Sequence, residues 1–177
     1  MKGPQSPLRP SATLKPSSKP AYCRRWLESN SESAALLSGL LRIIHPELFQ
    51  MAREAMVKLA DLEESDNLIK IWMSLFNGCQ VMSNRETPVH RDNNSRSEWY
   101  DVLCSVGPYG SADLELTNAG LTFQYNTGVI LAICGRILRH GVSKTDGDRI
   151  CLAYYMRENV QRRLGSEPAS WSYLQNL

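Results

Sequence analysis

Apolar side chains follow a helical repeat in the first third of the chain. The residues Ser29-Asn30-Ser31-Glu32 match the S-x-x-E capping box, and apolar positions three or four residues apart follow them. This pattern predicts a helix over about 30–44. Pro46 suits the first position of a second helix, whose apolar stripe continues to about residue 60. We interpret these two helices as a support layer, and a further apolar segment follows at residues 68–76.

From residue 79 onward, the pattern changes to short β-rich runs separated by turn residues. The runs contain many branched and aromatic side chains, and clusters of Gly, Asn, Pro and Asp lie between them. Strands are predicted at 79–82, 89–91, 99–106, 113–117, 121–125, 129–134, 137–142 and 149–156. Their close spacing is typical of a sandwich or jelly roll. Leu121, Phe123 and Tyr125 alternate with polar residues, which predicts a strand with one buried face.

These patterns predict an α+β, mainly β fold: a jelly roll with supporting N-terminal helices. Residues 1–22 hold five of the nine prolines among serines and lysines, which predicts a basic, flexible tail. Residues 23–177 have the length of a single domain, with helical support over about 29–76 and a β core over about 79–157. The longest apolar run is far shorter than the roughly 20 residues of a spanning helix, so we expect no membrane partner.

Charge and cysteine content narrow the possible partners and compartments. The net charge is +2, but residues 1–22 carry +4, so the remaining 155 residues sum to −2. Binding to nucleic acid by charge alone would require a more basic protein, so any DNA contact must depend on a local patch and a pocket. The five cysteines form no CxxC pair, and the N-terminus lacks the apolar core of a secretion signal. We therefore expect free thiols in a reducing, intracellular compartment.

Two histidines in predicted strands suggest a metal site. His90 and Asp92 form an H-x-D triplet, and residues i and i+2 of a strand point to the same side. His140, fifty residues later, would complete a set of two histidines and one carboxylate. Such a facial set leaves three coordination positions open, which is what an iron(II) oxygenase needs for a cosubstrate and dioxygen. The alternative interpretation is a surface ion pair beside an unrelated histidine.

Two arginines flank the histidines at spacings that favour a dicarboxylate ligand. Arg149 lies nine residues after the second histidine, on the next predicted strand, where its guanidinium can bind a carboxylate in a bidentate pair. Arg85 lies five residues before the H-x-D triplet and can serve a second carboxylate. Strand alternation places Cys151 on the same face as Arg149, so this thiol is a further candidate contact. Together with the metal set, these residues favour a 2-oxoglutarate site.

Three stretches carry a resemblance to a known family: 83–92 (SNRETPVHRD), 135–142 (GRILRHGV) and 147–157 (GDRICLAYYMR). Together they resemble the iron(II)/2-oxoglutarate dioxygenases of the TET/JBP family, which modify nucleic acids, and they look closest to the short fungal members. The resemblance covers roughly residues 70–165. It implies a double-stranded β-helix fold with iron(II), 2-oxoglutarate and dioxygen as metal, cosubstrate and oxidant. The implied iron ligands are His90, Asp92 and His140, and the implied 2-oxoglutarate contacts are Arg149 and Arg85.

The resemblance also implies oxidation of a methyl group on a base flipped out of duplex DNA, and hence a nuclear protein. Tyr155 takes the place of the family's aromatic ring that stacks on the base. Two residues later, this chain has Arg157 where well-known members have a histidine. The base therefore stays open: 5-methylcytosine comes first, and thymine and N6-methyladenine are alternatives. Either Asn94 or Ser95 would be a further base contact.

Two other functions fit parts of the same pattern. The metal set also serves hydroxylases of protein side chains or small molecules, and the −2 charge of residues 23–177 is compatible with such substrates. A non-catalytic β-barrel binding module would instead use the histidines structurally. Formation of succinate from 2-oxoglutarate would exclude the binding module, and analysis of nucleosides would separate the two enzymes.

Overall fold

Contacts within the chain divide it into two units. The computed structural model describes residues 8, 11, 20–62 and 68–173. The first unit, called the helical unit below, draws on Met1–Leu75, Val160–Pro168 and Tyr173–Leu177. The second, called the β unit, draws on Phe76–Asn159 and Ala169–Ser172. Both units contain residues that are distant in sequence.

The helical unit contains the two predicted helices, which the structure confirms. Its elements are α1 (Pro20–Ser29), α2 (Ser31–Ile44), α3 (Pro46–Ala60), the short 3-10 helix η2 (Ile69–Ile71) and most of α4 (Glu158–Arg163). Helices α2 and α3 pack against each other and bury apolar side chains such as Leu41 and Leu48, both fully inaccessible to solvent. Leu36 belongs to the same apolar series in the sequence but is 70% exposed.

The predicted capping box at residues 29–32 does not form, and helix α1 before it was not predicted. Ser29 is the last residue of α1, and Asn30 makes no side-chain capping hydrogen bond to α2. Its Nδ2 donates instead to the carbonyl of Trp26, because the chain reaches Asn30 already helical. Pro20 begins α1, where a missing N–H costs no helical hydrogen bond. The predicted flexible tail lies mostly outside the described residues.

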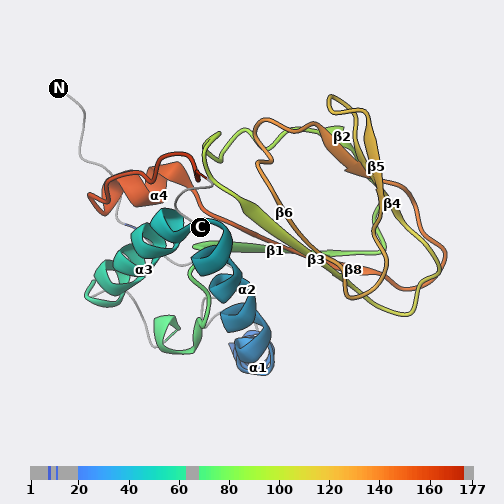
Figure 1. Ribbon diagram of the computed structural model, residues 1–177. Helices are drawn as coiled ribbons and strands as arrows, with labels where there is room; N and C mark the ends of the chain where they lie inside the picture. The colour runs from blue at the N-terminus through green and yellow to red at the C-terminus, as the bar shows by residue number, and fades with distance from the viewer. Residues whose placement is uncertain (1–7, 9–10, 12–19, 63–67, 174–177) are drawn as a thin grey trace. The chain divides into compact units, whose positions relative to one another are not determined.

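The β unit contains all eight predicted strands. They are β1 (Gly78–Ser83), β2 (Thr87–His90), β3 (Asp101–Val106), β4 (Asp113–Leu116), β5 (Leu121–Gln124), β6 (Ile130–Ile133), β7 (His140–Val142) and β8 (Ile150–Tyr155). They form two antiparallel sheets with strand orders β1-β8-β3-β6 and β2-β7-β4-β5 (Figure 1). Because the chain passes back and forth between the two sheets, the architecture is a double-stranded β-helix, as predicted.

The core of the β unit is an apolar cluster built from both sheets. Leu103 and Ile133 come from one sheet and Leu114, Leu116 and Val142 from the other. Strand β5 departs from the prediction of a buried face. Leu121 is 50% exposed and Phe123 is 44% exposed, although each lies opposite a buried leucine of β4. As the edge strand, β5 has a neighbour on one side only, so its apolar side chains lack part of their cover.

Two further sequence predictions concern the membrane and the thiols. Among the described helices, none has both the length and the apolar character that crossing a bilayer requires. All five cysteines are free, as predicted, and Cys151 is buried.

Candidate active site

Strands β2 and β7 bring the two predicted histidine ligands together. His90 is the last residue of β2, and His140 is the first residue of β7. The two residues are cross-strand partners in the antiparallel ladder, so the fifty residues between them do not separate them in space. Their ring centroids lie 4.4 Å apart.

Asp92 lies just beyond β2 and faces both rings. Its Oδ1 is 3.4 Å from Nε2 of His90, and its Oδ2 is 3.6 Å from Nε2 of His140. The backbone N–H of Asp92 donates to the carbonyl of Gly135, which holds the turn in place. One ligand atom from each of the three residues lies within 4.8 Å of the others. The predicted triad is therefore assembled.

The hydrogen bonds of the two imidazole rings engage Nδ1 and leave Nε2 of each ring available to a metal. Nδ1 of His90 donates to the carbonyl of Pro88, and Nδ1 of His140 donates to the carbonyl of Leu138, each at 2.9 Å. Since a carbonyl can only accept, each neutral ring carries its proton on Nδ1 and presents the Nε2 lone pair toward Asp92. Two imidazoles and a carboxylate with this outer support fit iron(II).

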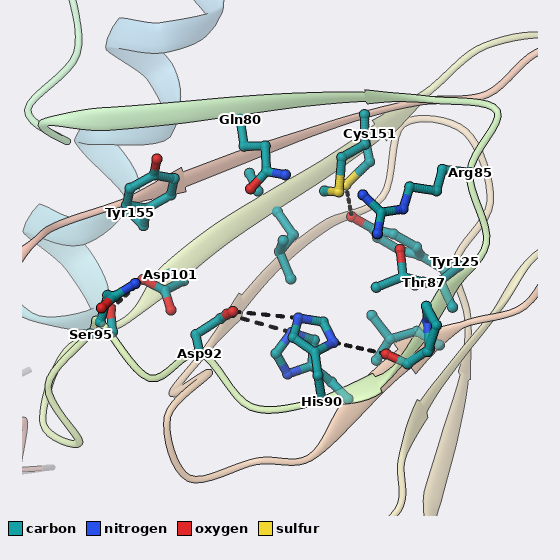
Figure 2. A pocket seen from close by; sticks show the side chains of 18 of the residues that line it. Gln80, Arg85, Thr87, His90, Asp92, Ser95, Asp101, Tyr125, Cys151 and Tyr155 are labelled. Atoms are coloured by element: carbon teal, nitrogen blue, oxygen red, sulfur yellow. Dashed lines mark hydrogen bonds and ion pairs between the residues drawn. The ribbon is translucent and has the colours of Figure 1, made fainter. Parts of the chain in front are cut away.

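The triad lines a cavity of about 430 Å³ within the β unit (Figure 2). Every residue that the sequence suggested for the site lines this cavity: His90, Asp92, His140, Arg149, Arg85, Cys151, Tyr155, Arg157, Asn94 and Ser95. In Figure 2, Cys151, Tyr125 and Arg85 lie on one side of the triad, and Tyr155, Asp101 and Ser95 lie on the other. The cavity therefore has two chemically different ends.

At one end, Arg149 is a buried cation with a free donor. Arg149 is only 2% exposed. Its Nε donates to Oγ of Ser105 at 2.9 Å, and its guanidinium lies over the ring of Tyr125. Its Nη2 is buried and has no hydrogen-bond partner, and no carboxylate among the described residues pairs with it. A buried guanidinium in this condition fits an anionic ligand, since unpaired buried charge is costly.

Asn84 fixes the backbone beside this cation. The N–H of Asn84 donates to the carbonyl of Arg149 at 2.8 Å, and the N–H of Arg149 donates to Oδ1 of Asn84 at 2.7 Å. Asn84 has a φ of 51°, a left-handed conformation that asparagine tolerates better than most residues. Arg85 follows it, exposed but lining the same cavity.

Cys151 and Tyr125 complete the wall at this end. The thiol of Cys151 lies 3.7 Å from the hydroxyl of Tyr125, and both side chains are buried. Burial raises the pKa of both groups, so both are protonated near neutral pH and add no negative charge beside Arg149. Tyr125 and Ser105 were not predicted as site residues, although the alternation along its strand placed Tyr125 on the face predicted to be buried.

At the other end, an aromatic ring and an arginine form a platform. Nη2 of Arg157 donates to the hydroxyl of Tyr155 at 3.3 Å, and the guanidinium lies 5.3 Å from the ring centroid. A Cβ on Gly78, the cross-strand partner of Tyr155, would collide with the ring. The ring thus packs closely on the glycine backbone. The predicted alternation along β8 is confirmed, since Arg149, Cys151, Tyr155 and Arg157 all line the cavity.

Asn94 and Ser95 differ in their surroundings. Asn94 is exposed, whereas Ser95 is buried and its hydroxyl donates to Oδ1 of Asp101 at 2.8 Å. Asp101 was not predicted as a site residue, yet it is 3% exposed and lines the cavity. Burial, with a contribution from the negative charge of Asp92, raises its pKa to about 7, against the opposing effect of the Ser95 hydrogen bond. The one sequence signal for Asp101 is its spacing of two and four residues from Leu103 and Ser105 on β3, which places the three side chains on the same face of the strand.

Comparisons with known proteins identify relatives of this chain. A family model, Tet_JBP, described as the oxygenase domain of the 2OGFeDO superfamily, matches residues 3–158. Among solved structures, the chain is similar to NgTET1 in complex with 5mC DNA, with a TM-score of 0.60 and 19% sequence identity. That similarity covers 86% of this chain and 56% of the NgTET1 chain, so this chain spans little more than half of its relative. A comparison with curated proteins gives no match.

Proposed function

Because this chain belongs to the Tet/JBP family of oxygenase domains in the 2-oxoglutarate- and iron-dependent dioxygenase superfamily, we propose that it oxidises the methyl group of a modified DNA base. The first candidate is 5-methylcytosine, and thymine and N6-methyladenine are alternatives. Family membership assigns iron(II) and 2-oxoglutarate to the site, with His90, Asp92 and His140 as the facial triad. The complex of NgTET1 with 5mC DNA supports a base as the substrate.

The observation that carries the proposal is that the metal triad lies between a cationic end and an aromatic end of one cavity (Figure 2). A small dicarboxylate suits the cationic end. A flat, polar substrate suits the aromatic end. An oxygenase acting on a base must hold these two ligands on opposite sides of its metal, with the methyl group close to the ion.

At the cationic end, Arg149 would bind the distal carboxylate of 2-oxoglutarate. Ser105 occupies its Nε and Tyr125 supports its guanidinium plane, so Nη2 is left for the ligand. Arg85 would add a second positive charge from the more exposed side. Iron(II) with 2-oxoglutarate and dioxygen supplies the oxidising chemistry, with succinate and carbon dioxide as coproducts. The surrounding residues orient the cosubstrate and limit the access of water.

At the aromatic end, Tyr155 would stack on the extruded base. Flipping a base out of a duplex costs a few kcal/mol, and stacking on an aromatic side chain returns about 1–3 kcal/mol. Arg157, already packed on Tyr155, carries only donors and would contact acceptor atoms of the base or a nearby phosphate. Either Asn94 or Ser95 would then contribute from the loop after the triad.

Local positive charge near the cavity mouth would hold the DNA backbone. Arg91 and Arg157 are both exposed; Arg91 follows the ligand His90 in the sequence, and Arg157 lines the cavity. A third arginine, Arg136, donates from Nη1 to the carbonyl of Asn93, which also lines the cavity. Phosphate contacts of this kind set the position of a protein on DNA without reading its sequence. The same proposal places the protein in the nucleus, where oxidation of 5-methylcytosine would lead to DNA demethylation.

A product assay tests this proposal. Purified protein is incubated with iron(II), 2-oxoglutarate, ascorbate and duplexes that contain 5-methylcytosine, thymine or N6-methyladenine. Succinate and modified nucleosides are quantified by mass spectrometry. His90→Ala and Asp92→Ala should abolish both products, whereas Asp113→Ala, an exposed carboxylate outside the cavity lining, should not. Tyr155→Ala should reduce base oxidation and spare the uncoupled turnover of 2-oxoglutarate.

The same assay separates the other functions. Succinate without any oxidised nucleoside would overturn the DNA proposal and favour a hydroxylase of proteins or small molecules, for which the −2 charge of residues 23–177 is no obstacle. Turnover that survives His90→Ala would refute the metal assignment. Absence of succinate with every substrate would favour a binding module.

A further inference from the structure

Asp101 carries a buried acceptor that no group in the described part of the protein satisfies. The residue is the first of β3 and is 3% exposed. Its Oδ1 accepts a hydrogen bond from Ser95, but its Oδ2 is buried and has no partner. Buried polar atoms are nearly always paired, so an unpaired oxygen on a residue that lines the cavity is available to a ligand that enters it.

The unpartnered oxygen lies close to the place where the reaction occurs. A Cβ built on Gly135 would be 2.7 Å from Oδ2 of Asp101 and 2.5 Å from Oδ2 of Asp92. The two carboxyl oxygens therefore lie close together against the backbone of Gly135, beside the triad. In Figure 2, Asp101 lies on the side of Tyr155, away from Tyr125 and Arg85. A base stacked on Tyr155 with its methyl group toward the triad would bring its polar edge to Asp101.

The chemistry of Asp101 distinguishes among the candidate bases. In its ionised form the carboxyl group of Asp101 only accepts hydrogen bonds, and no cation among the described residues pairs with it. Cytosine presents the N4 amino group on its edge, and adenine presents the N6 amino group, which keeps one N–H after methylation. Thymine presents the O4 acceptor at the corresponding position, which would face the carboxyl oxygen unfavourably.

We propose that Asp101 is a specificity-determining residue that accepts a hydrogen bond from the exocyclic amino group of the flipped base. This inference rests on the proposed function and deepens it. Ser95 positions the carboxyl group by donating to Oδ1, which leaves Oδ2 to face the base. The protein accordingly prefers amino-bearing bases, 5-methylcytosine and N6-methyladenine, over thymine.

The isosteric change Asp101→Asn reverses the polarity of the contact. Ser95 can still donate to Oδ1 of the amide, and the amide nitrogen then replaces Oδ2 as a donor. This variant should lower the ratio of 5-methylcytosine to thymine oxidation by about 5- to 150-fold, the range for a base contact worth about 1–3 kcal/mol. Asp113→Asn, the same change on an exposed strand residue outside the cavity lining, should keep the wild-type ratio.

The experiment measures initial rates for duplexes that differ only in 5-methylcytosine or thymine at one position. Fluorescence anisotropy with metal-free protein gives the affinities for the same duplexes, so the contact is also measured without turnover. A thermal melt verifies that Asp101→Asn is folded. A folded variant with the wild-type ratio in both measurements overturns the role of Asp101 alone. A wild-type protein that oxidises no base overturns the proposed function, and this inference with it.

Discussion

Gly135 is the position where a single methyl group should disturb the metal site most directly. A Cβ at this residue would lie 2.5 Å from Oδ2 of Asp92 and 2.7 Å from Oδ2 of Asp101. The carbonyl of Gly135 also accepts the backbone hydrogen bond of Asp92, so the glycine backbone lies against the ligand turn. Gly135→Ala therefore forces the Asp92 carboxylate away from its position in the triad.

The size of the displacement sets the expected effect. An ordinary contact between carbon and oxygen is about 3.2 Å or longer, so the carboxylate must move by about 0.7 Å. Normal metal–ligand distances vary by only about 0.2 Å, which is much less than this displacement. Loss of the support that orients a ligand typically costs about 10- to 100-fold in metal affinity, which corresponds to about 1.4–2.7 kcal/mol.

Calorimetric titration of the metal-free protein with Mn²⁺, a redox-stable probe for the iron site, measures this effect. Gly110→Ala is the matched control, because a Cβ at Gly110 would meet no atom within 4 Å. Circular dichroism melts should show that both variants are folded. If Gly135→Ala binds Mn²⁺ within twofold of the wild-type affinity, the reasoning from close packing around Asp92 is wrong.

Three further predictions concern the cosubstrate, a thiol and the helical unit. Arg149→Met should raise the apparent KM for 2-oxoglutarate about ten- to over a hundredfold, the effect of losing a charge-assisted contact, and an equal rise in Arg162→Met would contradict the assignment. Burial raises the pKa of Cys79 from 9.0 to about 11, which lowers the fraction of reactive thiolate at pH 8. Iodoacetamide should therefore alkylate Cys79 about a hundredfold more slowly in the folded protein than in urea, and equal rates would refute this. Leu41→Ala should destabilise the protein by about 2–5 kcal/mol in urea unfolding, while the exposed Leu36→Ala should stay within about 0.5 kcal/mol, and similar losses would contradict the burial pattern.

Local sequence rules were sufficient for the β-rich half of the chain. All eight strands were predicted, because clusters of Gly, Asn and Pro mark their ends and alternation marks their faces. The same alternation along β8 placed Arg149, Cys151, Tyr155 and Arg157 on one face, and the cavity lining confirms it. The metal set was also predictable, since so few histidines leave few possible pairs.

The start of the helical unit and the cover of β5 could not be predicted by local rules. The capping-box match at residues 29–32 fails because α1 already extends to Ser29. This helix was not predicted, because the prolines in residues 1–22 disfavour helical structure. Leu121 and Phe123 alternate correctly, but their exposure depends on β5 being an edge strand. Alternation defines the two faces of a strand, whereas packing against other elements decides whether a face is covered.

The amino-acid sequence alone determined the metal triad and the arginine and tyrosine candidates of the site, with the strands that carry them, whereas Asp101, Tyr125 and Ser105 entered the site only through the structure. Only the tertiary structure decided which of these groups lack partners. An arginine and an aspartate are surface residues by default, and nothing in the sequence indicates that Nη2 of Arg149 and Oδ2 of Asp101 are both buried and unpaired. That condition arises when the two sheets enclose a cavity and exclude water from both atoms. The free energy of a buried polar atom depends on its neighbours in space, and distant parts of the chain supply them.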